Sequence, residues 1–110
     1  MKALVMVSMF VGSLAFGYQN DCTIGRDGSL KTLIIDGRSV EYFDTLEEAA
    51  NGFAMVKNAG LCSNKKSNCT IGRVDGLKTV VVNDSVVEYF SDLASAVAGF
   101  NSLKNSGVCN

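Results

Sequence analysis

Two glutamates are the residues of this chain whose type and spacing best fit catalytic chemistry. Glu41 and Glu88 each stand directly before a Tyr-Phe pair, 47 residues apart. Two carboxylates about 5–10 Å apart act as acid and base, or acid and nucleophile, in glycoside hydrolysis. That chemistry needs different surroundings for the two groups, whereas equivalent positions predict similar ones. The alternative is a pair of exposed strand glutamates, each paired with Lys or Thr across the sheet.

Two pairs of basic residues form a second candidate site. Arg26 and Arg73 each end a Cys-Thr-Ile-Gly-Arg segment, and Lys31 and Lys78 begin the apolar segments that follow. Arginine and lysine side chains are suited to bind a carboxylate or phosphate group on a partner. The competing explanation is a local ion pair with one of the nearby acidic residues Asp27, Asp75 and Glu41.

Two tyrosines complete the candidate residues, and the composition excludes several classes of site. Tyr42 and Tyr89 follow the two glutamates and could anchor an interface, or they could pack at the core or its rim. The chain contains no histidine, which excludes Ser-His and Cys-His nucleophile pairs and zinc sites that need histidine. The acidic residues lack the spacing of an EF-hand, and each glycine before an arginine is isolated. We therefore predict no catalytic residues, no metal site and no cofactor.

The four cysteines predict two disulfides. Their spacings of 40, 7 and 40 residues lack the paired knuckles of zinc sites and the C-x-x-C of redox motifs. Cysteines in a short exported chain normally form a disulfide framework. If each half of the chain is three antiparallel strands and a helix, its two ends meet at one end of the sheet. This geometry favours Cys22–Cys62 with Cys69–Cys109, and a Cys62–Cys69 bond is the alternative.

The elements that must position these residues are duplicated. Residues 22–62 and 69–109 align without a gap, and 20 of the 41 paired positions are identical. A period in this range is typical of a supersecondary unit copied in tandem. Identity between the copies does not by itself identify functional residues, because a recent duplication would produce it as well.

Each copy shows the pattern of three strands followed by a helix. In the first copy, β-prone segments at 22–26, 31–35 and 39–43 are separated by Asp-Gly turns. A helix then begins after Asp44 and Thr45, which are N-cap residues, and ends at Gly60. The apolar positions at helical spacing are Leu46, Ala49, Ala50, Phe53 and Val56, and in the second copy Leu93, Ala96, Val97, Phe100 and Leu103.

A second set of expectations concerns close packing and strand register. Gly52 and Gly99 in mid-helix indicate a close approach of helix to sheet. A two-residue turn at Asp36-Gly37 would place Lys31 opposite Tyr42, Thr32 opposite Glu41 and Leu33 opposite Val40. One helix can cover only one face of three strands. The other face would therefore pack copy on copy or bind a partner.

The N-terminus reads as a secretory signal. Lys2 precedes an apolar run from Ala3 to Phe16, and Ala15-Phe16-Gly17 fits a signal peptidase site. The run would cover about 21 Å of a hydrocarbon core about 30 Å thick, which argues against an uncleaved anchor. We predict cleavage after Gly17 and a secreted or periplasmic protein that does not insert into the membrane. Without Lys2, nine basic and eleven acidic side chains remain, which argues against nucleic acid as a partner.

These observations predict an α+β protein with two tandem β-β-β-α repeats, related by pseudo-twofold symmetry and each stapled by a disulfide. Residues 1–17 would be the signal peptide, 18–62 the first repeat, 63–68 a polar linker and 69–110 the second repeat, with both repeats in one compact domain. Whether the strands merge into one sheet is left open. The strand leading into a glycine-ended helix resembles, in this pattern alone, the sporulation-related repeats that bind peptidoglycan.

The predicted function is a non-enzymatic binding or interaction module. Its partner would be a protein or a cell-envelope polymer, bound through the helix-free sheet face or an edge strand, and a homo-oligomer is possible. One alternative is a secreted enzyme inhibitor or toxin-like effector that presents the loop at Asp27-Gly28-Ser29 or Asp75-Gly76. The other is a carboxylate-based hydrolase that uses Glu41 and Glu88.

Overall fold

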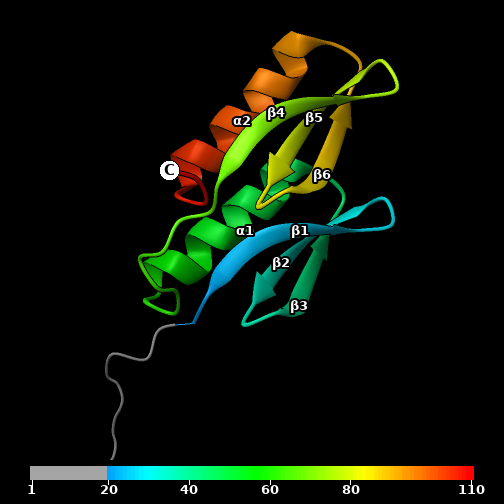
Figure 1. The fold of residues 1–110 in the computed structure, drawn as a ribbon. Coiled ribbons are helices and arrows are strands. Elements are labelled where there is room, and N and C mark those ends of the chain that lie inside the picture. Colours follow the sequence, from blue (N-terminus) through cyan, green and yellow to red (C-terminus); the bar gives the residue numbers. More distant parts are fainter. Residues whose placement is uncertain (1–19) are drawn as a thin grey trace, which may run out of the picture.

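The computed structural model describes residues 20–110, so the predicted signal peptide lies outside the described residues. It confirms two consecutive β-β-β-α repeats (Figure 1). The first repeat consists of β1 (Cys22–Asp27), β2 (Leu30–Ile35), β3 (Arg38–Phe43) and α1 (Leu46–Asn58). The second consists of β4 (Cys69–Val74), β5 (Leu77–Val82), β6 (Ser85–Phe90) and α2 (Leu93–Ser106).

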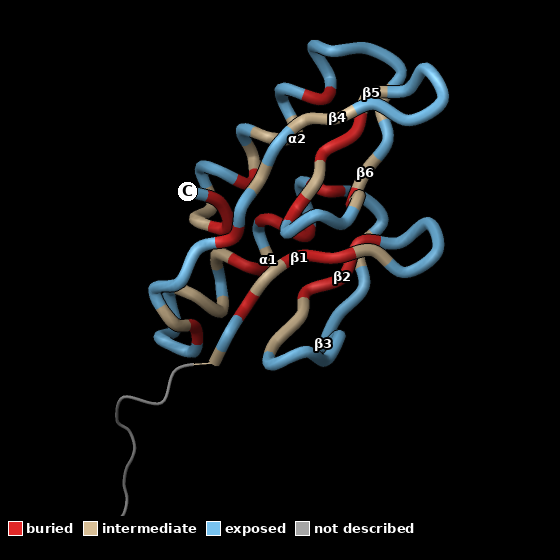
Figure 2. The backbone as a smooth tube through the Cα atoms, viewed as in Figure 1, coloured by how far each residue is buried: buried red, intermediate tan, exposed pale blue. Residues whose placement is uncertain are grey.

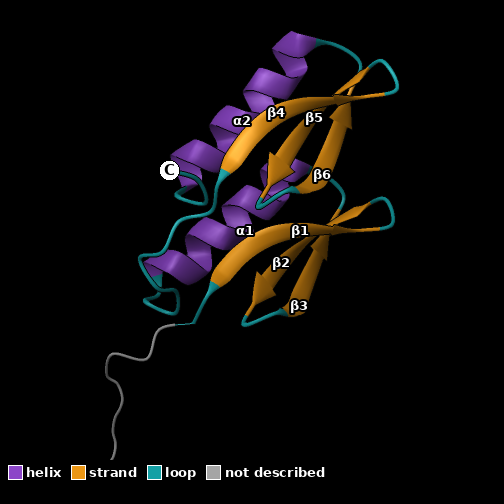
Figure 3. Ribbon diagram, in the orientation of Figure 1, coloured by secondary structure: helices purple, strands orange, loops and turns teal. Residues whose placement is uncertain are grey.

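The strands form one layer and the helices a second layer that covers one face of it (Figure 3). Each repeat has its own antiparallel sheet, in the order β1-β2-β3 and β4-β5-β6. Strand β1 of the first sheet contacts β6 of the second, yet within residues 20–110 no backbone ladder joins them. The chain therefore has two separate sheets, placed side by side along two of their edges.

The repeats are related by a shift in one direction and not by the expected pseudo-twofold axis. In Figure 1 both first hairpins point to the same side, and both helices run the same way. A twofold axis would bury the same positions in both repeats. Instead, Val87 on β6 is 0% exposed, whereas its counterpart Val40 on β3 is 51% exposed. The first repeat thus uses its β1 side and the second repeat uses its β6 side.

The hairpin turns form as expected, but the register beyond them does not. Asp36 and Gly37 connect β2 to β3 with φ of 51° and 80°, the conformation of a two-residue hairpin turn that favours Asp-Gly. Ser39 pairs with Ile34, but Glu41 pairs with Leu33, so Val40 is the extra residue of a β-bulge. The same shift occurs at Val87 in the second repeat.

This bulge corrects the predicted pairing of β2 with β3. Thr32 lies opposite Tyr42, and Lys31 lies opposite Phe43. Phe43 therefore faces the helix. A Cβ added to Gly52 of α1 would lie 2.6 Å from Cζ of Phe43, which confirms the close approach that the mid-helix glycine indicated.

The helix ends follow their capping residues. Thr45 accepts a hydrogen bond from the backbone N–H of Glu48, whose side chain in turn accepts one from the N–H of Thr45. This is a complete capping box. In the second repeat Asp92 accepts a hydrogen bond from the N–H of Ser95 at 2.7 Å, and this bond lowers the pKa of Asp92 below its ordinary value.

The core lies between each helix and its sheet, and a disulfide closes each repeat (Figure 2). The bonds are Cys22–Cys62 and Cys69–Cys109, as favoured by the sequence. The apolar face of α1 is buried as predicted. On α2, however, Leu93 and Val97 are 56% and 40% exposed, although their counterparts Leu46 and Ala50 are buried. The difference arises because α2 covers the first turn of α1, whereas among the described residues nothing covers that turn of α2.

Candidate functional site

Four of the eight predicted site residues, Arg26, Lys31, Glu88 and Tyr89, meet at the interface between the two repeats. The Glu88 carboxylate on β6 accepts from Lys31 Nζ at 2.5 Å and from Arg26 Nη1 at 3.4 Å. Lys31 is 5% exposed, and its ammonium also donates to the backbone carbonyls of Ser29 and Asp44. The carboxylate of the second repeat thus neutralises two cations of the first.

Arg26 makes two further contacts with β6. Its guanidinium lies 4.9 Å from the centroid of the Tyr89 ring, in cation–π geometry. Its Nη1 also donates to the backbone carbonyl of Val87, the bulge residue of β6, at 3.4 Å. The sequence had suggested Asp27, Asp75 or Glu41 as local partners of the four basic residues. It missed Glu88, because Glu41 and Glu88 have the same local sequence.

The helices and the linker complete this contact. A Cβ added to Gly99 would lie 3.2 Å from Cδ2 of Leu46, so the first residue of α1 packs against the middle of α2. The Lys57 side chain lies against Gly107, where α2 ends. On the strand side, the hydroxyls of Thr23 and Ser67 are 2.8 Å apart and share a hydrogen bond. We call this whole contact the inter-repeat interface; its defining residues are Thr23, Arg26, Lys31, Leu46, Lys57, Ser67, Val87, Glu88, Tyr89, Gly99 and Gly107.

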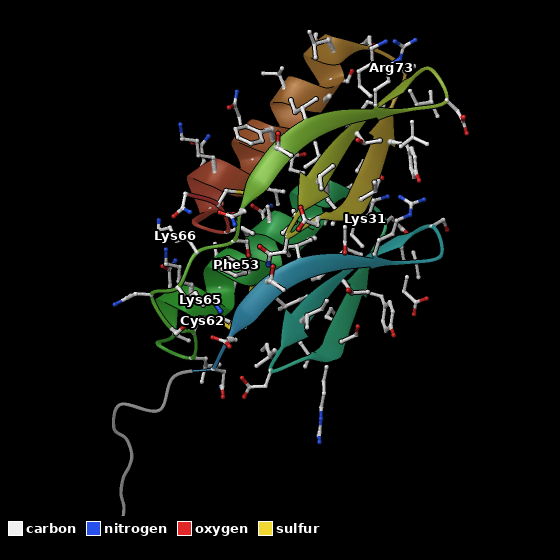
Figure 4. The ribbon with its side chains drawn as sticks, viewed as in Figure 1. Lys31, Phe53, Cys62, Lys65, Lys66 and Arg73 are labelled. Atoms are coloured by element: carbon white, nitrogen blue, oxygen red, sulfur yellow. A yellow bond between two sulfur atoms is a disulfide. The ribbon has the colours of Figure 1, made fainter. Side chains whose placement is uncertain are left out.

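The other four predicted site residues lie at the two ends of the strand layer. Arg73 and Lys78 belong to β4 and β5, on the side of the second repeat that faces away from the first; Figure 4 shows Arg73 there, well apart from Lys31. Glu41 and Tyr42 belong to β3, at the opposite end. Strands β2 and β1 separate Glu41 from Glu88, which corresponds to at least about 14 Å at ordinary strand spacing. The structure therefore does not bring the two glutamates into one site.

These ends present two different surfaces. The first, which we call the β4–α2 end face, consists of Thr70, Arg73, Lys78, Leu93, Val97 and Lys104. The second, the β3–α1 end face, consists of Asn20, Val40, Glu41, Tyr42, Phe43, Gly52, Met55 and Gly60. Each residue of the β4–α2 end face has a counterpart in the first repeat, and that counterpart lies on the side of the first repeat that faces the second repeat. Among residues 20–110, five of the ten exposed large apolar residues belong to these two faces.

The β3–α1 end face contains a hollow. It is lined by Tyr42, Phe43, Asn51, Gly52 and Met55. The counterpart on α2 is lined by Phe90, Ala98, Gly99 and Ser102, and there Leu46 enters it from the first repeat. The exposed hollow is thus the position that a leucine occupies in the inter-repeat interface.

The rest of the described chain offers no further candidate site. Lys65 and Lys66 lie in the linker beside the ends of the strands (Figure 4). Residues 20–110 contain no group of three or more Cys, Asp or Glu side chains arranged to hold a metal ion. A search of this same stretch finds no helix with the length and apolar character needed to cross a membrane.

The fold and the site can also be compared with known proteins. No protein-family model, curated protein or solved structure matches this chain. The interpretation of function therefore depends on the geometry of the two end faces and of the interface between the repeats.

Proposed function

We propose that this protein is a non-enzymatic protein-binding module and that it binds its partner through the β4–α2 end face. The observation that carries this proposal is the difference between equivalent residues. Leu46 and Ala50 are 4% and 2% exposed in the first repeat, where they pack near the second repeat. Their counterparts are equally or more apolar: Leu93 is again a leucine, and Val97 replaces an alanine. Both are exposed in this chain.

The chemistry of the face supports a protein as the partner. Leu93 and Val97 share this face with the cations of Arg73 and Lys78, and the first repeat uses the same combination, Leu46 with Arg26 and Lys31, to contact the second repeat. Apolar anchors bordered by arginine are typical of protein interfaces. A cell-envelope polymer of sugars would have fewer apolar groups to match Leu93 and Val97.

We also propose that the protein acts outside the cytoplasm. Two disulfides in a short chain are typical of an oxidising compartment, and a signal sequence at residues 1–17 would direct the chain there. We expect protein recovered from its natural compartment to have lost residues 1–17 and to react with a thiol reagent only after reduction. Intact mass measured after alkylation, with and without reductant, tests both points. A full-length chain with four alkylated thiols would contradict the proposed location.

Photo-crosslinking in the natural compartment tests the binding face. A photoreactive phenylalanine analogue at Val97 is expected to give one discrete protein adduct, because this position lies in the middle of the face. The same analogue at Lys65, which is exposed in the linker, serves as the control and should give none. Adding Leu93→Asp should remove the Val97 adduct. Equal adducts at both positions, or an adduct that survives Leu93→Asp, would show that the face does not bind a protein.

A further inference from the structure

We propose that the partner of the β4–α2 end face is a second copy of this chain, which binds with its β3–α1 end face. This inference rests on the proposed function and names the partner of the same surface. The inter-repeat interface serves as the template. The β4–α2 end face consists of counterparts of the first-repeat side of this interface, and the β3–α1 end face consists of counterparts of its second-repeat side. A second copy placed by the same shift that relates the two repeats would continue the layers.

Charge complementarity supports this pairing. In the inter-repeat interface Arg26 and Lys31 meet Glu88. Their counterparts Arg73 and Lys78 lie at one end of the molecule, and Glu41 lies at the other. Asp44 and Glu48 line the hollow beside Tyr42, on the same end face as Glu41. Lys104, in the last turn of α2, adds a third cation to the β4–α2 end face. The carboxylate near these cations is Asp92, whose pKa is lowered by its hydrogen bonds with Ser95 and in part by Lys78. One end of the molecule is therefore basic and the other acidic, which favours head-to-tail contact.

The edge strands offer the same side-chain contacts. Arg26 donates to the Val87 carbonyl and stacks on Tyr89. Across a contact between copies, Arg73 would have the bulge carbonyl of Val40 and the ring of Tyr42. Val40 and Tyr42 are about half exposed, whereas Val87, the counterpart of Val40, is buried where a neighbouring repeat covers it.

The helices provide an apolar contact. Leu46 packs against Gly99 within the chain, and the exposed Leu93 would enter the hollow beside Gly52 in the second copy. Two of the lining residues are larger there, since Asn51 and Met55 stand where α2 has Ala98 and Ser102. The hollow is nevertheless present, and the flexible thioether of Met55 can pack around an inserted leucine.

Two smaller contacts have counterparts as well. The hydrogen bond between Thr23 and Ser67 would become one between Thr70 and Asn20, which keep compatible polar groups. Lys57 lies against Gly107 at the end of α2. Lys104 would lie in the same way against Gly60, and no atom occupies the space that a Cβ would take there. A cation at this position interacts favourably with the carbonyl end of a helix.

Such a contact does not close on itself. Each copy offers one acidic end and one basic end, so a dimer still has one free end of each kind, and the assembly continues into a chain of copies. Within the molecule the linker gives the interface an effective concentration of about 1 mM. We therefore expect the oxidised protein, without residues 1–17, to assemble progressively as its concentration approaches about 1 mM.

Mixing two variants, each blocked at one end, tests the proposal. Glu41→Arg blocks the acidic end, and Arg73→Glu with Lys78→Glu blocks the basic end. Sedimentation equilibrium should find each variant monomeric alone, because either homotypic contact places like charges together. An equal mixture should assemble beyond the dimer as the unchanged protein does, because both contacts between unlike variants pair opposite charges: one keeps the original residues, and the other has their charges exchanged. Lys65→Glu in the linker is the matched charge control and should assemble like the unchanged protein.

Circular dichroism and the urea midpoint of each variant establish that it is folded before mixing. The proposal is overturned if the unchanged protein remains a monomer at about 1 mM, if the mixture does not assemble, or if Glu41→Arg alone still self-associates. The Val97 crosslink separates this failure from that of the proposed function. An adduct with a different protein would refute only the second copy, whereas the absence of any specific adduct, together with a monomeric protein, would refute both.

Discussion

Removing the Cys22–Cys62 bond is expected to lower the free energy of unfolding by about 4 kcal/mol, a large part of the stability of a domain this small. The bond closes a loop with a sequence separation of 40 residues, and most of the expected effect is the entropy that the unfolded chain regains. Because both sulfur positions are buried, Cys22→Ala with Cys62→Val keeps apolar atoms there. Urea unfolding followed by circular dichroism measures the change.

The second repeat provides the matched control for this prediction. Cys69–Cys109 spans the same separation, so Cys69→Ala with Cys109→Val should lower the unfolding free energy by a similar amount. Both variants should still unfold in one transition, since Lys31 and Glu88 join the repeats across a buried interface. A loss below about 1 kcal/mol in both variants would contradict the chain-entropy argument.

The local elements could be predicted from the sequence because each has a local cause. Asp36-Gly37 specifies a tight hairpin, Thr45 with Glu48 specifies a helix start, and the mid-helix Gly52 indicates close packing against the sheet. The disulfides followed from where the ends of a three-strand-and-helix unit must meet. All of these depend on residues within one repeat. The second repeat has the same cysteines and mid-helix glycine, with Asn83-Asp84 at the hairpin and Asp92 at the helix start.

The β-bulges at Val40 and Val87 could not be predicted in this way. Both interrupt segments whose alternation of apolar and polar residues also fits a regular ladder, and the two-residue turn sets only the first pairs. One extra residue changes which side chains lie opposite one another. As a result Phe43, and not Tyr42, faces the helix.

The way the two repeats pack against each other could not be predicted from the sequence either. Each copy has an arginine (Arg26 or Arg73) and a glutamate (Glu41 or Glu88) at equivalent positions. The sequence is therefore equally compatible with ion pairs within a repeat and between repeats. Only the three-dimensional arrangement distinguishes Glu88, which contacts Arg26, from Glu41, which lies on an open end. Duplication thus made the elements easy to predict and their mutual contacts ambiguous.

The same ambiguity is useful experimentally, because the chain places identical residues in two environments. A substitution at one copy can be compared with the same substitution at the other, with local sequence held nearly constant. Any difference then reports the neighbouring repeat and not the intrinsic preference of the residue. Glu41 and Glu88 are the clearest such pair.

Glu88→Gln is expected to lower the free energy of unfolding by about 2–3 kcal/mol, measured by urea unfolding at a concentration where the protein is monomeric. The substitution keeps the shape of the side chain but leaves the Lys31 ammonium, whose side chain is 6% exposed, without its counter-charge. Breaking one side of a fully buried ion pair has a larger effect, about 3–5 kcal/mol. The smaller expectation reflects the partial exposure of Glu88.

Glu41→Gln is the control, with an expected change within about 0.5 kcal/mol, because an exposed charge contributes little. Lys31→Met in the Glu88→Gln background should recover part of the lost stability, since it removes the unpaired buried charge and keeps the length of the side chain. If Glu41→Gln and Glu88→Gln destabilised the protein equally, the asymmetry of the two glutamates would be refuted. The head-to-tail arrangement of the repeats, and with it the template for assembly, would then lose its energetic basis.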